Sequence, residues 1–196
     1  LMRSSAASDV YKRQGAKNRT LGLIGFGGIG TEVAKRAVPF GMKVIYFCRH
    51  PNPADDAAYG VQSVSMEELL KESDYVVAAV PLTDQTFHLF NEECIAQMKA
   101  GSVLINIARG PVVDEEALAQ ALASGHLGGC AVDVFPKEPC TDSVLTRYSN
   151  ALLTPHSATS TAENSKATNF AAANNLVNYL KKDIDAKYVV VQGTRY

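Results

Sequence analysis

A glycine-rich turn between two apolar segments constrains this chain most. Gly25, Gly27 and Gly30 have the spacing G-x-G-x-x-G, follow the apolar residues 21–24 and open an amphipathic segment that reaches about residue 40. The first glycine allows a tight turn, the second lets a pyrophosphate approach the backbone, and the third lets helix and strand pack closely. A glycine turn without a ligand is the alternative, but the flanking strand, the helix and a second strand supply the context that the motif requires. The turn therefore predicts a dinucleotide-binding site at a helix N-terminus.

The rest of the chain alternates short apolar runs with longer amphipathic ones. The runs are rich in β-branched residues, which suits strands buried on both faces of a parallel sheet. Strands that alternate with helices form βαβ units. We therefore expect an α/β fold, a doubly wound, Rossmann-like parallel sheet in the order 3-2-1-4-5-6 with right-handed connections. The expected strands are residues 21–24, 44–47, 75–80, 103–107 and 129–132, with weaker candidates at 61–64 and 151–153.

Helix starts carry recognisable signals. Ser65 and Ser160 each begin an S-x-x-E capping box, and Asn91 and Asp114 are expected N-caps. The last helix is expected at about residues 161–182. Its apolar spacing predicts one buried face, formed by Phe170, Ala173, Val177 and Leu180.

The end of the second strand bears on the choice of dinucleotide. The fingerprint places an acid about 20 residues after the glycines, where it binds the ribose 2′-hydroxyl of NAD. Here that position holds Cys48, followed by Arg49. A neutral residue beside an arginine removes repulsion and adds a partner for a 2′-phosphate, so we expect NADP to be preferred over NAD. The alternative is a solvated Arg49, with Asp55 or Asp56 reaching the ribose from the next loop.

Composition narrows the class of protein and its partners. The chain has 196 residues, enough for one ordinary domain, and its net charge of −1 lacks the basic excess that nucleic-acid binding requires. No apolar run reaches the roughly 18–20 residues needed to cross a bilayer, so we expect no membrane association. The four cysteines form no CxxC pair and no metal-like spacing with the four histidines. We expect a reduced, cytoplasmic protein without a metal site, although two disulfides are the alternative.

Polar residues follow three further strands, where an open α/β sheet places its ligand crevice. Arg109 follows the strand at 103–107, Glu138 lies in the loop after 129–132, and His156 follows 151–153. An arginine that binds a carboxylate, a histidine that protonates a carbonyl and a carboxylate that supports the histidine suffice to reduce a 2-keto acid. Taken singly, each is also explained as a solvated loop residue. Their shared position beside the dinucleotide turn favours one catalytic site.

Four segments resemble the signature motifs of the D-isomer-specific 2-hydroxyacid dehydrogenases, in the family's order: residues 25–30, 106–114, 133–139 and 154–156. The similarity extends over about residues 19–191. It implies that Arg109 binds the substrate's carboxylate and carbonyl, that His156 donates the proton, and that Glu138 favours the charged imidazole. It also implies that Asp133 contacts the nicotinamide carboxamide and that the protein forms a homodimer. Asp133 is therefore one of the expected cofactor-binding residues. The others are Gly25, Gly27, Gly28, Ile29, Gly30, Cys48, Arg49, Val80, Pro81, Ile107, Ala108, Arg109, His156 and Ser157.

The chain departs from the family pattern in three ways. Cys48-Arg49 replaces the usual acid, as in members that prefer NADP, and Ser157-Ala-Thr-Ser replaces the more common Ile-Gly-Gly after the histidine. The family's substrate domain, which precedes the nucleotide-binding domain, has no counterpart in the sequence. We therefore expect a C-terminal fragment of low activity: residues 1–14 as an unrelated leader, 15–160 as the NAD(P)-binding domain, and 161–196 as a helix and tail that return to the substrate domain.

The predicted function is that of an oxidoreductase, transferring a hydride between NAD(P)H and a small 2-keto or 2-hydroxy acid. One alternative is a regulatory module that binds NAD(P) without chemistry, and another is a methyltransferase with the same glycine turn. Neither needs Arg109, Glu138 and His156 together. Phosphoglycerate, hydroxypyruvate, glyoxylate and lactate all remain open as the acid.

Overall fold

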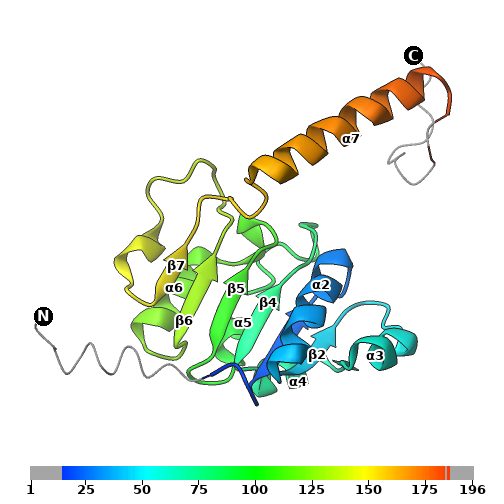
Figure 1. The fold of residues 1–196 in the computed structure, drawn as a ribbon. Helices are drawn as coiled ribbons and strands as arrows, with labels where there is room; N and C mark the ends of the chain where they lie inside the picture. The colour runs from blue at the N-terminus through cyan, green and yellow to red at the C-terminus, as the bar shows by residue number, and fades with distance from the viewer. Residues whose placement is uncertain (1–14, 184, 186–196) are drawn as a thin grey trace, which may run out of the picture. The chain divides into compact units, whose positions relative to one another are not determined.

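The expected strands form one parallel sheet in the computed structural model, which describes residues 15–183 and 185. The expected leader at residues 1–14 and most of the expected C-terminal tail lie outside the described residues. The strand order is β3-β2-β1-β4-β5-β6-β7, which confirms the doubly wound fold and adds a seventh strand beside β6 (Figure 1). The strands are β1 Thr20–Ile24, β2 Lys43–Phe47, β3 Gln62–Ser63, β4 Tyr75–Ala78, β5 Val103–Asn106, β6 Gly129–Val132 and β7 Ala151–Leu153.

Two apolar clusters pack on the sheet. In one, Leu23 and Tyr46 of the sheet pack with Ala34 of helix α2 (Gly28–Ala37), and all three are fully buried. The other includes Leu69 of α4 (Met66–Glu72) and Leu118 of α6 (Glu115–Ala123), also buried. None of the described helices is long and apolar enough to cross a membrane. The α-helices are α2 Gly28–Ala37, α3 Pro53–Tyr59, α4 Met66–Glu72, α5 Glu92–Ala96, α6 Glu115–Ala123 and α7 Ala162–Leu180, and the 3-10 helices are η1 Val38–Phe40, η2 Gly110–Val112 and η3 Val144–Arg147.

The order of the strands fixes where a ligand can bind. Strand β1 is paired with β2 on one side and with β4 on the other, so the chain reverses its direction of travel across the sheet at β1. In an open parallel sheet the ligand crevice lies at this switch point, beyond the carboxyl ends of the strands. The loops that follow β1, β2, β4, β5 and β6 therefore emerge at one edge.

The helix-start signals are confirmed with one exception. Ser65, Asn91 and Asp114 each accept a hydrogen bond from an amide in the first turn of the helix that follows. Ser160 is not an N-cap, because the Thr161 hydroxyl accepts from the Asn164 amide at 3.1 Å and α7 begins at the next residue. The Ser160 amide instead closes a turn onto the Ser157 carbonyl. Ser160 and Thr161 both carry a hydroxyl that can cap a helix. The turn at Ser160 leaves Thr161 at the N-cap position.

The chain divides into two units, residues 1–155 and 156–196. In the second unit, α7 contains no buried residue. The expected burial of Phe170, Ala173, Val177 and Leu180 is therefore wrong: Phe170 is 69% exposed and Leu180 72% exposed. A helix face is buried only where another element packs on it, and α7 is the one regular element among the described residues of this unit.

Candidate functional site

The glycine turn has the conformation that its sequence predicts. Gly25 adopts a φ of 97°, and a Cβ at this position would lie 2.4 Å from the Ala79 carbonyl oxygen. A Cβ at Gly30 would lie 2.4 Å from the Gly25 carbonyl oxygen. Any side chain at either position would therefore collide with backbone. These glycines let β1, the turn and α2 pack together.

The start of α2 is open and suited to an anion. Gly27 is the N-cap and has no side chain to accept a hydrogen bond, and the first turn carries no acidic residue. A Cβ at Gly27 or Gly28 would have no heavy atom within 4 Å. The first amides of a helix have no partner within it and carry partial positive charge, so they bind phosphate readily. The glycine turn therefore fits a dinucleotide pyrophosphate.

The end of β2 presents the residues expected to choose the dinucleotide. Cys48 is half-buried and Arg49 is exposed. Nearby, the Asp56 carboxylate accepts a hydrogen bond from the Tyr46 hydroxyl at 2.7 Å and one from the Ser63 amide at 3.4 Å. Burial, followed by this bond to Asp56, raises the pKa of Tyr46 to about 12, so the phenol stays protonated. Asp56, one of the two acids proposed as an alternative ribose ligand, is therefore engaged with the protein.

The other expected cofactor-lining residues differ in their exposure. Val80 lies beside Gly25, since its Cγ1 would be 3.0 Å from a Cβ there. Ile29 and Pro81 are exposed, and Ile107 is half-buried. Ala108 differs, because it is 5% exposed and its side chain belongs to the core. Its contact with a cofactor would have to come from its backbone.

Asn106 builds the loop that carries Arg109. It is 1% exposed at the end of β5, where its Oδ1 accepts from the Ala108 amide and its Nδ2 donates to the Arg109 carbonyl, both at 3.0 Å. The Arg109 guanidinium donates to the Ala108 carbonyl at 2.7 Å, and the side chain is exposed. Asn106 was not predicted as a site residue from the sequence. An asparagine directly after an apolar run is the available signal, because its side chain can organise a turn.

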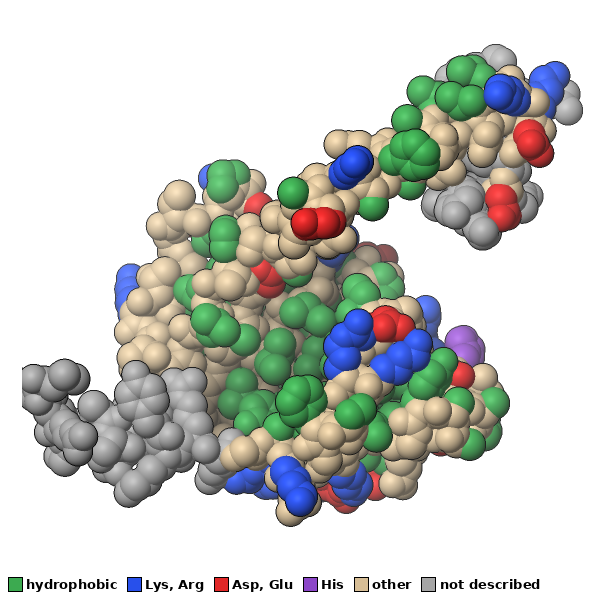
Figure 2. All heavy atoms as spheres, in the orientation of Figure 1, with side chains coloured by type: hydrophobic (Ala, Val, Ile, Leu, Met, Phe, Trp, Pro, Cys, Tyr) green, Lys and Arg blue, Asp and Glu red, His purple; other side chains and the backbone are tan. Residues whose placement is uncertain are grey.

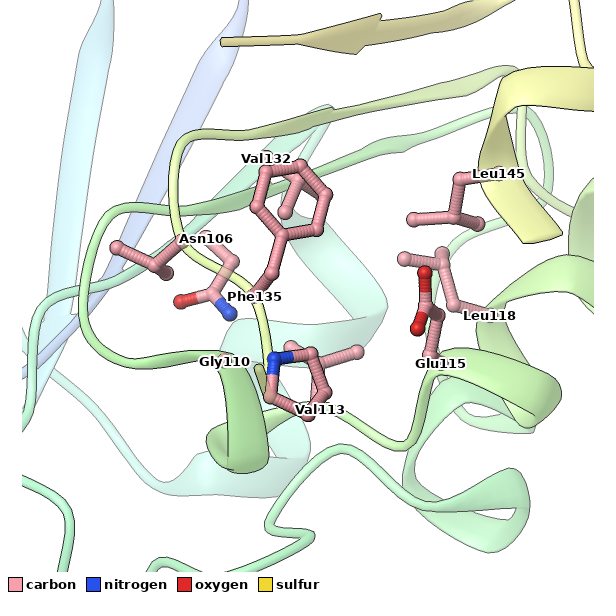
Figure 3. A pocket seen from close by; sticks show the side chains of 10 residues that line it. Asn106, Gly110, Val113, Glu115, Leu118, Val132, Phe135 and Leu145 are labelled. Carbon is pink, nitrogen blue, oxygen red and sulfur yellow. The ribbon is translucent and has the colours of Figure 1, made fainter. Parts of the chain in front are cut away.

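The Arg109 loop is in contact with the loop after β6. A Cβ at Gly110 would lie 2.0 Å from the Phe135 carbonyl carbon, so only glycine allows this approach. Within the second loop, the Glu138 carboxylate accepts from the Phe135 amide at 2.9 Å. Figure 3 shows the small cavity beside this contact, with Asn106 and Phe135 on one side and Glu115 and Leu118 on the other. The structure thus brings together the loops of Arg109 and Glu138.

Asp133 is held by two neighbouring strands. Its amide donates to the Asn106 carbonyl at 3.1 Å, and the Thr154 hydroxyl donates to its carboxylate at 2.5 Å. Thr154 follows β7 and was not assigned to the site from sequence. A threonine distant in the chain gives no local sign of this contact, which arises only when β7 pairs with β6.

His156 and Ser157 begin the second unit. Both are exposed, and His156 adopts a φ of 50°. The expected pairing of His156 with Arg109 and Glu138 stays a prediction.

Comparison with known proteins identifies the family. A sequence profile described as "D-isomer specific 2-hydroxyacid dehydrogenase, NAD binding domain" matches residues 2–158. That range includes the glycine turn, Arg109, Glu138 and His156.

Individual relatives agree with this match. The chain is 41% identical to a glyoxylate reductase of Thermococcus litoralis, over 92% of this chain and 54% of the reductase. It is 47% identical to a hydroxypyruvate reductase of Thermotoga maritima, over 74% of this chain and 47% of that protein. A solved NAD-dependent formate dehydrogenase of Staphylococcus aureus, in complex with NAD, superimposes with a TM-score of 0.85 at 30% identity, over 97% of this chain and 57% of that one. The chain spans about half the length of these relatives.

Proposed function

The chain belongs to the D-isomer specific 2-hydroxyacid dehydrogenase family, and on that premise we propose that it forms the cofactor half of a reductase for small 2-keto acids. One observation carries the proposal: the Arg109 and Glu138 loops are in contact at the sheet edge where the uncapped α2 begins. A module that only binds a dinucleotide has no need of this pairing. The reductase names of the relatives support glyoxylate or hydroxypyruvate as the substrate.

Each residue then has one task. The nicotinamide dinucleotide supplies the hydride, and the amides of the glycine turn hold its pyrophosphate. Arg109 binds the substrate carboxylate by paired, charge-assisted hydrogen bonds. His156 gives a proton to the carbonyl oxygen as negative charge develops there, and Glu138 favours the protonated imidazole. Asp133, fixed by Thr154, orients the carboxamide of the nicotinamide.

NADP is the proposed preference. Arg49 is exposed directly after Cys48, so its guanidinium can reach a 2′-phosphate that no acid at position 48 repels. The engagement of Asp56 with Tyr46 and Ser63 supports this choice over a ribose contact from Asp56. A homodimer and a cytoplasmic location stay predictions.

A substitution at Cys48 tests the cofactor choice. Cys48→Asp adds an acceptor for the 2′-hydroxyl and repels a 2′-phosphate, so we expect the Kd for NADPH to rise about tenfold and the Kd for NADH to fall. Cys48→Ser is the matched control and keeps the parent's preference. Equal affinity of the parent chain for both dinucleotides, measured by titration, contradicts the proposal.

Turnover tests the chemistry. We expect the 196-residue chain to bind NADPH but to reduce glyoxylate and hydroxypyruvate below the usual enzymatic range of about 1–10³ s⁻¹, because it spans about half the length of the reductases it resembles and turnover needs a site that excludes water. In a protein extended to the relatives' full length, His156→Gln lowers kcat by about 10²–10⁴. Parent-like turnover of that variant excludes His156 as the proton donor.

A further inference from the structure

Tyr46 connects the two parts of the dinucleotide site. It lies in β2, is fully buried, and precedes the Cys48-Arg49 pair by two residues. Its ring stacks on Phe26 of the glycine turn, with centroids 4.0 Å apart and planes at 21°. One buried side chain thus supports the pyrophosphate turn from one side.

The hydroxyl of the same residue reaches the helix that follows the Arg49 loop. It donates to the Asp56 carboxylate in α3 at 2.7 Å. Asn52 is the N-cap of α3, where its side chain accepts from the Ala54 amide at 3.1 Å. The Tyr46 hydroxyl therefore holds α3, the helix that begins directly after the loop at residues 48–52. The near end is fixed separately, since the Phe47 carbonyl accepts from the Gly25 amide at 2.9 Å.

We propose that Tyr46 is a positioning residue for dinucleotide selectivity, whose hydroxyl fixes the loop that carries Arg49 relative to the glycine turn. The inference rests on the proposed binding of a 2′-phosphate by Arg49. The loop at residues 48–52 spans two anchors, and the hydroxyl supplies the second. With that anchor lost, Arg49 samples more positions and pays more ordering entropy to bind the phosphate. A ribose without a 2′-phosphate does not depend on Arg49 and loses little.

Asp56 is the partner that makes the hydroxyl effective. The remaining carboxylate oxygen accepts from the Ser63 amide, so Asp56 joins α3 to β3 as well as to Tyr46. Asp56 thereby holds the loop in place without touching the dinucleotide. This separates it from the alternative in which Asp56 is itself a ribose ligand.

The test measures selectivity, because a purely structural role weakens both dinucleotides alike. The chain has no tryptophan, so nicotinamide fluorescence reports NADPH and NADH binding directly. Tyr46→Phe keeps the ring on Phe26 and removes the hydroxyl. We expect its Kd for NADPH to rise about threefold to tenfold, the usual effect of one lost hydrogen bond, with less than about a twofold change for NADH.

Companion variants sharpen the result. Asp56→Asn retains an oxygen that accepts from Tyr46 but turns an NH2 group toward the Ser63 amide, so we expect it to lose less selectivity than Asp56→Ala. Asp56→Ala behaves like Tyr46→Phe and serves in its place should Tyr46→Phe not fold. Adding Tyr46→Phe to Arg49→Ala changes the selectivity no further, because both act through one contact.

Each contrary outcome has its own meaning. Equal weakening of NADPH and NADH by Tyr46→Phe overturns the positioning role and leaves the proposed function intact. Preferential loss of NADH in Asp56→Asn makes Asp56 a ribose ligand and also overturns it. A parent chain with no NADPH preference overturns the proposed cofactor choice, and the positioning role with it. A parent that binds neither dinucleotide contradicts the proposed function as a whole.

Discussion

At the amino end of the sheet, charged side chains neutralise one another, whereas at the carboxyl end two arginines of the candidate site are exposed. Asp74, just before β4, accepts from Lys99 at 2.8 Å, from the Thr20 amide at 2.9 Å and from Arg19 at 3.1 Å. Arg49 is exposed at the opposite edge, and the Arg109 guanidinium contacts a neutral carbonyl. At the amino-end edge, ion pairs thus connect neighbouring strands. At the carboxyl-end edge, the two arginines are exposed, as the binding of an anionic ligand requires.

The pKa of Asp74 reflects this internal pairing. Burial by itself raises the pKa of the carboxyl, but the Lys99 ammonium, the Thr20 amide and the Arg19 guanidinium outweigh burial and lower it below its usual value. The carboxylate is therefore more stable in the folded chain than in the unfolded one. This edge contributes to the free energy of unfolding at neutral pH.

The largest expected effect concerns Gly110, which lies at the carboxyl-end edge of the sheet but has a structural role. It tests whether that edge serves ligand binding alone. Gly110→Ala places a Cβ 2.0 Å from the Phe135 carbonyl carbon. Separating the two loops should lower the free energy of unfolding by about 3 kcal/mol and also weaken NADPH binding. Denaturation in urea, followed by circular dichroism, measures the first effect.

Gly27→Ala is the matched control for Gly110→Ala. Its Cβ enters open space at a φ of −92°, which alanine adopts without strain. We expect stability within about 0.5 kcal/mol of the parent, with NADPH affinity at least about tenfold lower because the methyl group occupies the phosphate's approach. Equal stability of the two variants shows that the loops after β5 and β6 do not meet as described.

The second-largest expected effect concerns Asp74, at the amino-end edge, and tests whether charge stabilises that edge. Asp74→Asn removes the charge that three donors share, and the side chain is only 15% exposed. Because Arg19 and Lys99 are partly solvated, we expect a loss of about 1–2 kcal/mol at pH 7, with the Kd for NADPH unchanged. Paired thermal melts and NADPH titrations measure both.

Acid should remove the difference between Asp74→Asn and the parent. A carboxyl whose folded-state pKa is lowered stabilises the protein above its unfolded pKa and stops doing so as the pH falls through the folded value. The two unfolding curves should therefore converge below about pH 4, near the ordinary pKa of an aspartate. A constant difference from pH 7 to pH 3 would show that Asp74 acts through shape and not through charge.

The sequence predicted most of the fold because its signals are local. Apolar β-branched runs, the glycine spacing and N-caps such as Asp114 act within a few residues, and the structure contains each of them. Ser160 and Thr161 carried the same capping chemistry side by side, so the sequence did not separate them. The burial of α7 was predicted from its own spacing, although burial depends on a second element that packs against it.

The candidate site was predicted less completely, in part because Thr154 acts across strands. Arg109 and Glu138 were predicted from their positions at strand ends, and the structure brings their loops into contact. Thr154 was not predicted as a supporting residue, because its hydrogen bond to Asp133 exists only after β6 and β7 pair. Asn106 was not predicted either, although its side-chain hydrogen bonds to Ala108 and Arg109 are local. The contact at Gly110 had no signal beyond the glycine itself.

The smallest expected effect concerns a charge cluster that is exposed. On α2, which leaves the ligand edge, the Glu32 carboxylate accepts from Lys35 and Arg36 at 2.7 Å each. Figure 2 shows basic side chains gathered around an acidic one over this helix. Hydrogen bonds from Lys35 and then Arg36 lower the pKa of Glu32 to about 2, so any stabilisation is present above its usual value near 4.5 and is lost between there and about pH 2. Because water and salt screen these exposed groups, Glu32→Gln should shift the melting temperature by less than about 1 °C at 0.15 M salt. A shift as large as that of Asp74→Asn, measured in the same melts, would mean that the number of ion pairs and not their burial distinguishes the two edges.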